Sequence, residues 1–136
     1  MPAGQHPLDG IRRHQLLPKS VAAEIPPLYS QDEVSDPTVR VKFFSPYSPA
    51  TWFITEFDGD DTMFGYAELH TGGGELGYVS LSEFQGANRN GLPLVERDMH
   101  WSARPLSEAK AELADVQGPY SFRLGVGGSD PNRNPK

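Results

Sequence analysis

The stretch TWFITEFDGDDTMFGYAELH, residues 51–70, decides the fold predicted for this chain. Two runs rich in aromatic and β-branched residues flank the acidic segment DGDD, and runs of this composition favour β-strands. Because the connection between them is short, the two strands are expected to pair antiparallel. A tight turn at Gly59 would place Phe57 opposite Thr62.

This register distributes the side chains of the hairpin over two faces of a sheet. One face would carry Phe53, Phe57, Phe64 and Tyr66. The other would carry Trp52, Ile54, Glu56 and Ala67, with Gly65 opposite Ile54. Both faces hold apolar groups, so both are expected to be covered. A carboxylate on a partly apolar face needs a partner, and we expect Glu56 to form an ion pair with Lys42 or Arg97.

The flanking sequence extends the hairpin into a single α+β domain over residues 18–124. Alternating or β-rich runs predict further strands at 38–44, 75–81 and 92–101. Capping signals and helical spacing predict short helices at 18–25, 80–86 and 105–116. We therefore predict an antiparallel meander sheet of four or five strands with two or three short flanking helices. Segments 1–17 and 125–136, which are rich in Gly, Pro, Asn and Asp, are expected to be disordered tails.

Composition and charge narrow the classes of function. The 136 residues include no cysteine and carry a net charge of −6, which excludes thiolate chemistry and disulfides. Residues 31–75 hold nine acidic and two basic side chains, a net charge of −7. Such a surface repels phosphate backbones and anionic lipid and favours cations or basic protein patches, and the alternative is that the charge only keeps the protein soluble. If the charge serves binding, we expect a protein partner with a basic patch, no direct nucleic-acid binding and no membrane binding. Without a long apolar run or a secretory signal, a cytoplasmic location is expected.

The acidic hairpin tip is the first candidate site. The interaction residues would be Asp58, Asp60 and Asp61, with Glu75 nearby. Aspartates in turns also bond the local backbone, and clustered oxygen ligands suit a hard cation. The sequence leaves these three interpretations open.

A second candidate site is a carboxylate and histidine cluster. Glu96, Asp98 and His100 recur with a period of two, which places them on one face of a strand. Together with Glu56 they could ligate a divalent metal ion. The alternative is a polar, exposed face of an edge strand. If the cluster forms, the protein is a metal-dependent enzyme. Otherwise it needs neither a cofactor nor a catalytic residue.

Four segments together point to a known family. They are IPPLYSQDEVSDPTVRVKFFSPYSPATWFITEFDGDDTMFGY (25–66), ELGYVSLSEF (75–84), GLPLVERDMHW (91–101) and PLSE (105–108). In this combination the chain resembles the bacterial family named domain of unknown function 2958. The resemblance implies a small bacterial protein, often encoded on plasmids and integrated elements near antirestriction and DNA-processing genes. It implies no activity, cofactor or catalytic residue. We therefore predict a non-catalytic interaction module, with the metal-dependent enzyme as the alternative.

Overall fold

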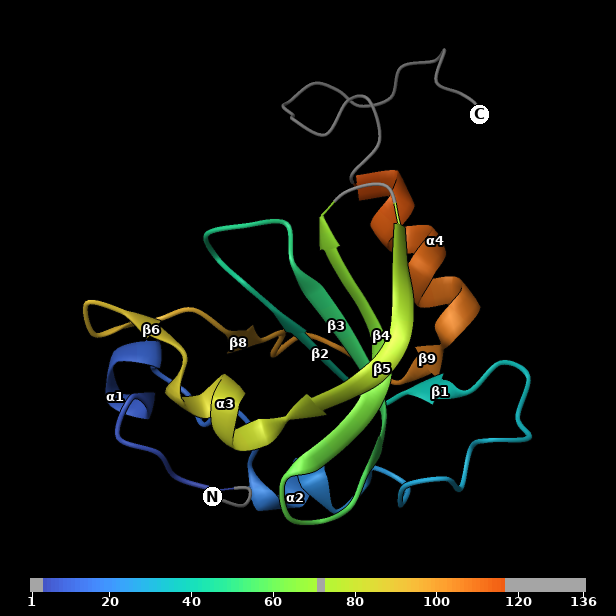
Figure 1. Ribbon diagram of the computed structural model, residues 1–136, viewed down its shortest axis with the longest axis horizontal. Coiled ribbons are helices and arrows are strands. Elements are labelled where there is room, and N and C mark those ends of the chain that lie inside the picture. Colours follow the sequence, from blue (N-terminus) through green and yellow to red (C-terminus); the bar gives the residue numbers. More distant parts are fainter. Residues whose placement is uncertain (1–3, 71–72, 117–136) are drawn as a thin grey trace.

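The centre of the molecule is a five-stranded antiparallel sheet, seen in a computed structural model that describes residues 4–70 and 73–116 (Figure 1). The strands follow the spatial order β5-β4-β3-β2-β8. Their bounds are β2 Val41–Phe44, β3 Thr51–Phe57, β4 Thr62–His70, β5 Gly73–Ser80 and β8 Glu96–Arg97. The first four strands form the predicted meander, and β8 adds the fifth strand beside β2. The predicted α+β class and antiparallel sheet are confirmed.

The central hairpin keeps the predicted register over half of its length. Ile54 lies opposite Gly65, as expected, but the register shifts between Ile54 and Glu56. Beyond this bulge Phe57 lies opposite Met63 rather than Thr62. One extra residue in a strand reverses the faces of all residues that follow it. The prediction that Phe53 and Phe57 share a face is therefore wrong.

The two faces of the sheet hold separate cores. The first core contains Leu16, Leu17, Ile25, Val41, Phe43, Ile54, Phe57, Met63, Leu81, Phe84 and Val95. The second contains Val39, Phe53, Leu106, Ala109 and Leu113. α3 (Leu81–Gly86) contributes to the first core and α4 (Leu106–Val116) to the second. Figure 1 shows α4 on one side of the sheet, with α2 and α3 away from it. Each face carries a buried core, as predicted, but Leu76 and Tyr78 of β5 stay exposed.

Helix boundaries follow the local signals. The Ser80 side chain accepts a hydrogen bond from the backbone N–H of Glu83, so the predicted capping box starts α3. The predicted helix at 18–25 is shorter, α2 at Lys19–Ala22. None of the helices in the described ranges has the length and apolar character needed to cross a membrane. The remaining short elements are β1 Thr38–Val39, β6 Asn88–Arg89, β7 Leu92–Pro93 and β9 Arg104–Pro105.

The N-terminal segment is part of the folded domain, and the disordered extension predicted over 1–17 is wrong for its described part. Residues 9–12 form a helix, α1 (Asp9–Arg12), and Leu16 and Leu17 are buried in the first core. Arg12 is buried, and its guanidinium donates to the carbonyl oxygens of Val95 (2.9 Å) and Gln85 (3.1 Å).

A second arginine holds the same segment from the sheet side. The guanidinium of Arg97 donates to the carbonyl oxygens of Leu16 (3.1 Å) and Gln15 (3.4 Å). Bonds that involve a charged donor are the stronger class, and here two of them join residues more than 80 positions apart in the chain. The predicted tail at 125–136 lies outside the described residues.

Candidate functional site

The carboxylate of Asp58 stabilises the hairpin turn. Its Oδ1 accepts backbone N–H groups from Asp60 (2.8 Å), Asp61 (2.9 Å) and Thr62 (3.1 Å). Desolvation would raise the pKa of Asp58, but these hydrogen bonds outweigh it and lower the pKa below the usual value. Local backbone bonding, one of the three interpretations left open by the sequence, therefore accounts for this carboxylate.

Asp61 connects the hairpin tip to the start of α3. Its Oδ2 accepts the Ser80 hydroxyl at 2.7 Å, and its Oδ1 accepts the Ser82 backbone N–H at 2.7 Å. The Ser80 hydroxyl is the main cause that lowers the pKa of Asp61. Negative charge near a helix N-terminus is favourable. Of the four predicted interaction residues, Asp58 and Asp61 thus have structural roles, whereas Asp60 and Glu75 present exposed side chains.

Glu56 is buried and anchors a distant turn. Its Oε1 accepts the backbone N–H of Tyr29 at 2.8 Å, and its Oε2 accepts that of Gln31 at 2.9 Å. The predicted ion pair with Lys42 or Arg97 is wrong, because two backbone N–H groups supply the partner that a buried carboxylate requires.

The predicted metal cluster does not assemble. Within residues 4–70 and 73–116, no three or more His, Asp or Glu side chains gather as a metal ion would require. Asp98 instead lies 3.9 Å from the Lys42 ammonium and accepts the backbone N–H of His100 at 2.9 Å. Glu96 faces Phe44 in the β2–β8 pair, and Glu56 is engaged in the anchored turn. The four residues therefore do not form a shared site.

A row of exposed apolar side chains is the feature that the sequence prediction missed. We define the β5 face as Tyr29, Phe64, Leu76 and Tyr78. Phe64 lies opposite Tyr78 across the strand pair, with ring centroids 4.9 Å apart. Exposed fractions are 56% for Leu76, 57% for Tyr78 and 63% for Tyr29. Both faces of the hairpin were expected to be covered, but the alternation of Leu76 and Tyr78 in the last meander strand is a signal that could have identified this exposed face.

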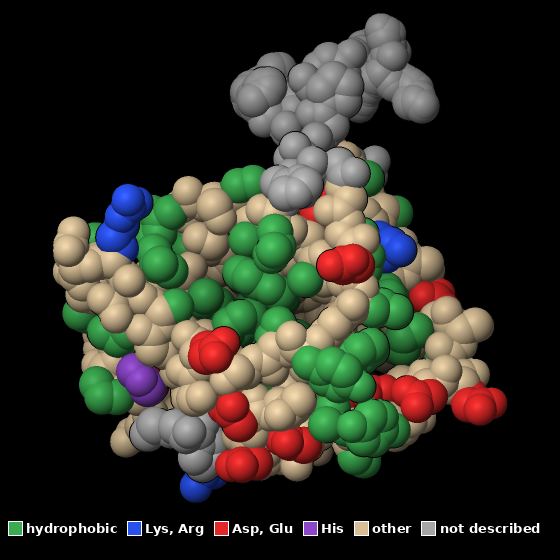
Figure 2. All heavy atoms as spheres, in the orientation of Figure 1, with side chains coloured by type: hydrophobic (Ala, Val, Ile, Leu, Met, Phe, Trp, Pro, Cys, Tyr) green, Lys and Arg blue, Asp and Glu red, His purple; other side chains and the backbone are tan. Residues whose placement is uncertain are grey.

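Acidic groups border the β5 face. Desolvation raises the pKa of Tyr78, and its neighbours Tyr29 and Asp32 add to the rise. Desolvation also raises the pKa of Tyr66, the next aromatic residue on this side of β4, and Glu68 adds to the rise. Figure 2 shows apolar side chains over the lower part of β4 and β5, with acidic side chains on either side of them.

The backbone of Tyr29 has an unusual conformation. Its φ angle is 70°, a left-handed value that is uncommon for a bulky side chain. Such a conformation persists when the surroundings determine it, and the bond from the Tyr29 N–H to Glu56 is one such constraint. The buried carboxylate therefore helps to position an exposed ring beside Tyr78.

A family model, described as Protein of unknown function (DUF2958), matches residues 12–120 of the chain. The chain belongs to this family. The resemblance predicted from the four sequence segments is thereby confirmed, and the match extends from Arg12 across the whole sheet and α4. No curated protein and no solved structure matches the chain.

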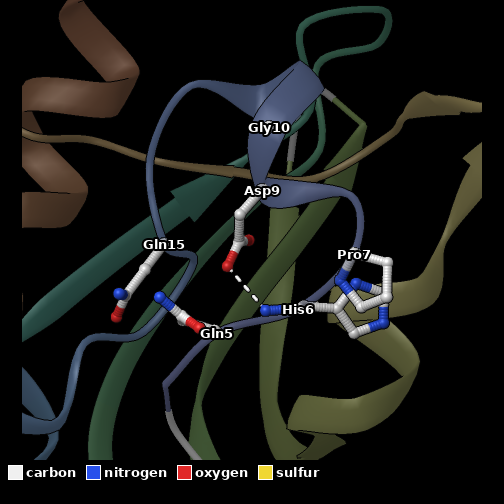
Figure 3. A pocket seen from close by; sticks show the side chains of 6 residues that line it. All are labelled: Gln5, His6, Pro7, Asp9, Gly10 and Gln15. Carbon is white, nitrogen blue, oxygen red and sulfur yellow. Dashed lines mark hydrogen bonds between the residues drawn. The ribbon is translucent and has the colours of Figure 1, made fainter.

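One hollow of this DUF2958 protein is lined mostly by residues that precede the matched range 12–120 in the sequence. It has a volume of about 450 Å³ and is lined by Gln5, His6, Pro7, Asp9, Gly10 and Gln15 (Figure 3). Both oxygens of its one carboxylate are engaged within the protein. Asp9 Oδ1 accepts from the Arg12 guanidinium at 2.7 Å, and Oδ2 accepts the His6 backbone N–H at 2.7 Å. Asp9 therefore helps to hold the N-terminal segment in its folded conformation.

A second hollow of the DUF2958 domain lies at the junction of β5 and α3. It has a volume of about 360 Å³ and is lined by Thr62, Tyr78, Val79, Ser80, Glu83 and Phe84. It therefore adjoins the β5 face through Tyr78. Its walls combine apolar side chains with one exposed carboxylate, that of Glu83.

Proposed function

We propose that this DUF2958 protein is a non-catalytic interaction module that binds a basic segment of another protein through the β5 face. The observation that carries the proposal is the exposed row of Leu76, Tyr78 and Tyr29 beside acidic groups. The proposal keeps the partner chemistry predicted from the sequence. It moves the contact from the hairpin tip, where Asp58 and Asp61 are engaged, to the neighbouring strand.

Exposed apolar area supplies the affinity in this proposal. Single exposed apolar residues are common on soluble proteins, but contiguous patches often mark interaction sites. A large apolar side chain such as leucine contributes about 1.5–3 kcal/mol when fully buried. Aromatic groups are also enriched at the energetic centres of protein interfaces.

Acidic side chains supply the selectivity. Asp32 is near enough for its charge to add to the raised pKa of Tyr78, and the stretch from residue 31 to 75 carries a net charge of −7. Complementary charge speeds association and disfavours partners of the same sign. One cation already rests on this side of the molecule, since the Lys110 ammonium lies 4.6 Å from the centre of the Tyr66 ring. An aromatic ring in this environment thus accepts an ammonium group.

The family resemblance supplies a biological setting for such a partner. It implies a bacterial protein encoded on mobile elements near antirestriction and DNA-processing genes. Proteins that handle DNA present basic surfaces. We infer that the acidic module occupies such a surface and imitates the charge of nucleic acid, without binding nucleic acid itself.

Affinity capture from lysate of the source cells, read by mass spectrometry, tests the proposal. Tyr78→Ser should reduce recovery of a basic partner by at least about tenfold, which corresponds to about 1.4 kcal/mol. The matched control is Tyr47→Ser, since Tyr47 is 59% exposed but belongs to the turn between β2 and β3. Tyr47→Ser should leave recovery unchanged.

A charge-reversal pair separates the acidic contribution from the apolar one. The test variant changes two exposed acids near the β5 face, Asp32→Lys and Glu75→Lys. The control variant makes the same change in net charge elsewhere, with Glu24→Lys after α2 and Glu108→Lys in α4, both at exposed positions. The test variant alone should lose the partner. Equal recovery of the same proteins by wild type, Tyr78→Ser and the test variant overturns the proposed function.

A further inference from the structure

We propose that the outer edge of β5 receives an extended basic strand from the partner, which adds a sixth strand to the sheet. This inference rests on the proposed function and specifies how the partner binds. Among the described residues, β5 is paired only with β4 and is therefore an edge strand. Edge strands present unpaired N–H and C=O groups that another chain can use.

The register identifies the backbone groups that point outward. The backbone N–H of Leu81 donates to the carbonyl oxygen of Asp61 at 2.7 Å, which makes these residues a hydrogen-bonded pair at the end of the ladder. Hydrogen-bonded and non-hydrogen-bonded pairs alternate along an antiparallel ladder. Val79 and Gly77 therefore bond toward β4. Leu76, Tyr78 and Ser80 point their N–H and C=O groups away from it.

This edge lacks most of the features that usually block strand addition. β5 has eight residues, GGELGYVS, with no proline and one charged side chain, Glu75. Its register irregularity with β4 lies between Ala67 and His70, at the end remote from Ser80. Natural edge strands are usually protected by proline, lysine, bulges or short length.

The side chains beside this edge fit an alternating partner strand. On one side, Leu76 and Tyr78 would contact alternate residues of the added strand. On the other side, a Cβ built on Gly77 would meet no atom within 4 Å, which leaves open space for a partner side chain. The hollow beside Tyr78 and Val79 has Glu83 on its wall, so the aliphatic stem of a lysine could lie there with its ammonium near the carboxylate.

Charge favours a basic occupant over a second copy of this chain. An edge-to-edge pair of identical strands would bring together two molecules that each carry a net charge of −6, and the one charged side chain of each paired strand would be a glutamate, Glu75. Like charges brought together across a strand pair are destabilising. A strand with alternating basic and β-branched residues meets opposite charge and apolar surface together.

Hydrogen exchange on the full chain tests the proposal with defined probes. One synthetic peptide alternates valine and lysine, and the control peptide alternates valine and glutamate. The lysine peptide should slow exchange of the outward amides of Leu76, Tyr78 and Ser80 by at least about tenfold at saturation. The glutamate peptide should have no effect. No slowing with either peptide overturns the proposal, as does slowing of these amides already in the free, dilute protein. Slowing that appears only as the protein is concentrated without peptide assigns the edge to a second copy, which also overturns it.

A pair of substitutions at one position isolates the backbone contribution. Leu76→Ala and Leu76→Pro both remove the leucine side chain, but only proline also removes the outward N–H. Proline at an outward position of an edge strand leaves the inner ladder intact, and continued protection of the Gly77 and Val79 amides checks this. Leu76→Pro should bind the lysine peptide at least about tenfold more weakly than Leu76→Ala. Equal binding of the peptide by the two variants overturns strand addition. The proposed function still stands in that case if Tyr78→Ser loses the captured partner and Tyr47→Ser keeps it.

Discussion

Replacing Glu56 with glutamine tests the link between the buried bulge and the surface. The side chain keeps its shape but loses its charge and one of its two acceptor oxygens. One of the two backbone N–H groups, on Tyr29 or Gln31, must then face an amide NH₂ instead of a carboxylate oxygen. A hydrogen bond to a charged group contributes about 1.5–3 kcal/mol, and an unsatisfied buried donor costs about 1–3 kcal/mol. We therefore expect Glu56→Gln to lower the free energy of unfolding by about 2–4 kcal/mol.

Denaturant unfolding and amide exchange together measure this effect. The midpoint should fall without a change in slope, since the surface exposed on unfolding is the same. In the native state, the Tyr29 and Gln31 amides should exchange faster in the variant. The control is Glu24→Gln, because Glu24 is exposed and its substitution should change stability by less than about 0.5 kcal/mol. If Glu56→Gln stays within this same range and leaves both amides protected, the anchoring role is refuted.

Three further perturbations test other parts of the fold. Gly65→Ala should prevent folding or cost more than about 3 kcal/mol of overpacking strain, because its Cβ would lie 1.9 Å from the Phe53 carbonyl oxygen. Thermal unfolding measures this cost, and Gly77→Ala is the matched control because its Cβ would meet no atom within 4 Å. Arg12→Ala should destabilise by about 3–5 kcal/mol in denaturant titration, because it leaves buried polar partners unpaired. His14 has its pKa lowered from 6.5, mainly by burial, so the unfolded chain binds more protons and stability should fall as the pH drops below 6.5. His14→Gln should remove that pH dependence, and an unchanged pH profile would contradict the assignment.

The expected behaviour of His14 follows from its hydrogen bonds. Its Nδ1–H donates to the carbonyl oxygen of Arg12 at 3.1 Å, which leaves Nε2 to accept the backbone N–H of Arg97 at 3.2 Å. A protonated imidazole has no acceptor, so acidification breaks the second bond. The nearby charges of Arg97 and Arg12 also oppose protonation. His14 therefore helps to hold the N-terminal segment only while it is neutral.

The elements that could be predicted from the sequence are those whose signals lie in residues close together in the chain. The meander follows from alternation and short turns, and α3 follows from the Ser80 to Glu83 capping pattern. The folded conformation of the N-terminal segment could not be predicted in this way. Its polar composition suggests disorder, but Arg12 and Arg97 hold it through carbonyl groups far away in the sequence. Long-range bonds of this kind leave no periodic signal.

In the candidate site, too, the features set by neighbouring residues could be predicted and the others could not. The local role of Asp58 was among the predicted alternatives, because an aspartate in a turn bonds residues close to it in the chain. The bulge after Ile54 has no glycine or proline to mark it, and it determines which side of the sheet Glu56 occupies. Metal-ligand spacing along a strand therefore could not show that Glu56 would be engaged by the backbone of Tyr29 and Gln31.

The bulge also links a buried carboxylate to the exposed β5 face. Without the extra residue, Glu56 would lie on the face of Ile54 and Gly65, within the first core. With it, Glu56 lies opposite Phe64, which in turn lies opposite Tyr78. From there Glu56 reaches the Tyr29 backbone, whose left-handed conformation places the exposed ring beside Tyr78. A bulge costs ladder hydrogen bonds locally, and in this protein it places the anchor of the β5 face.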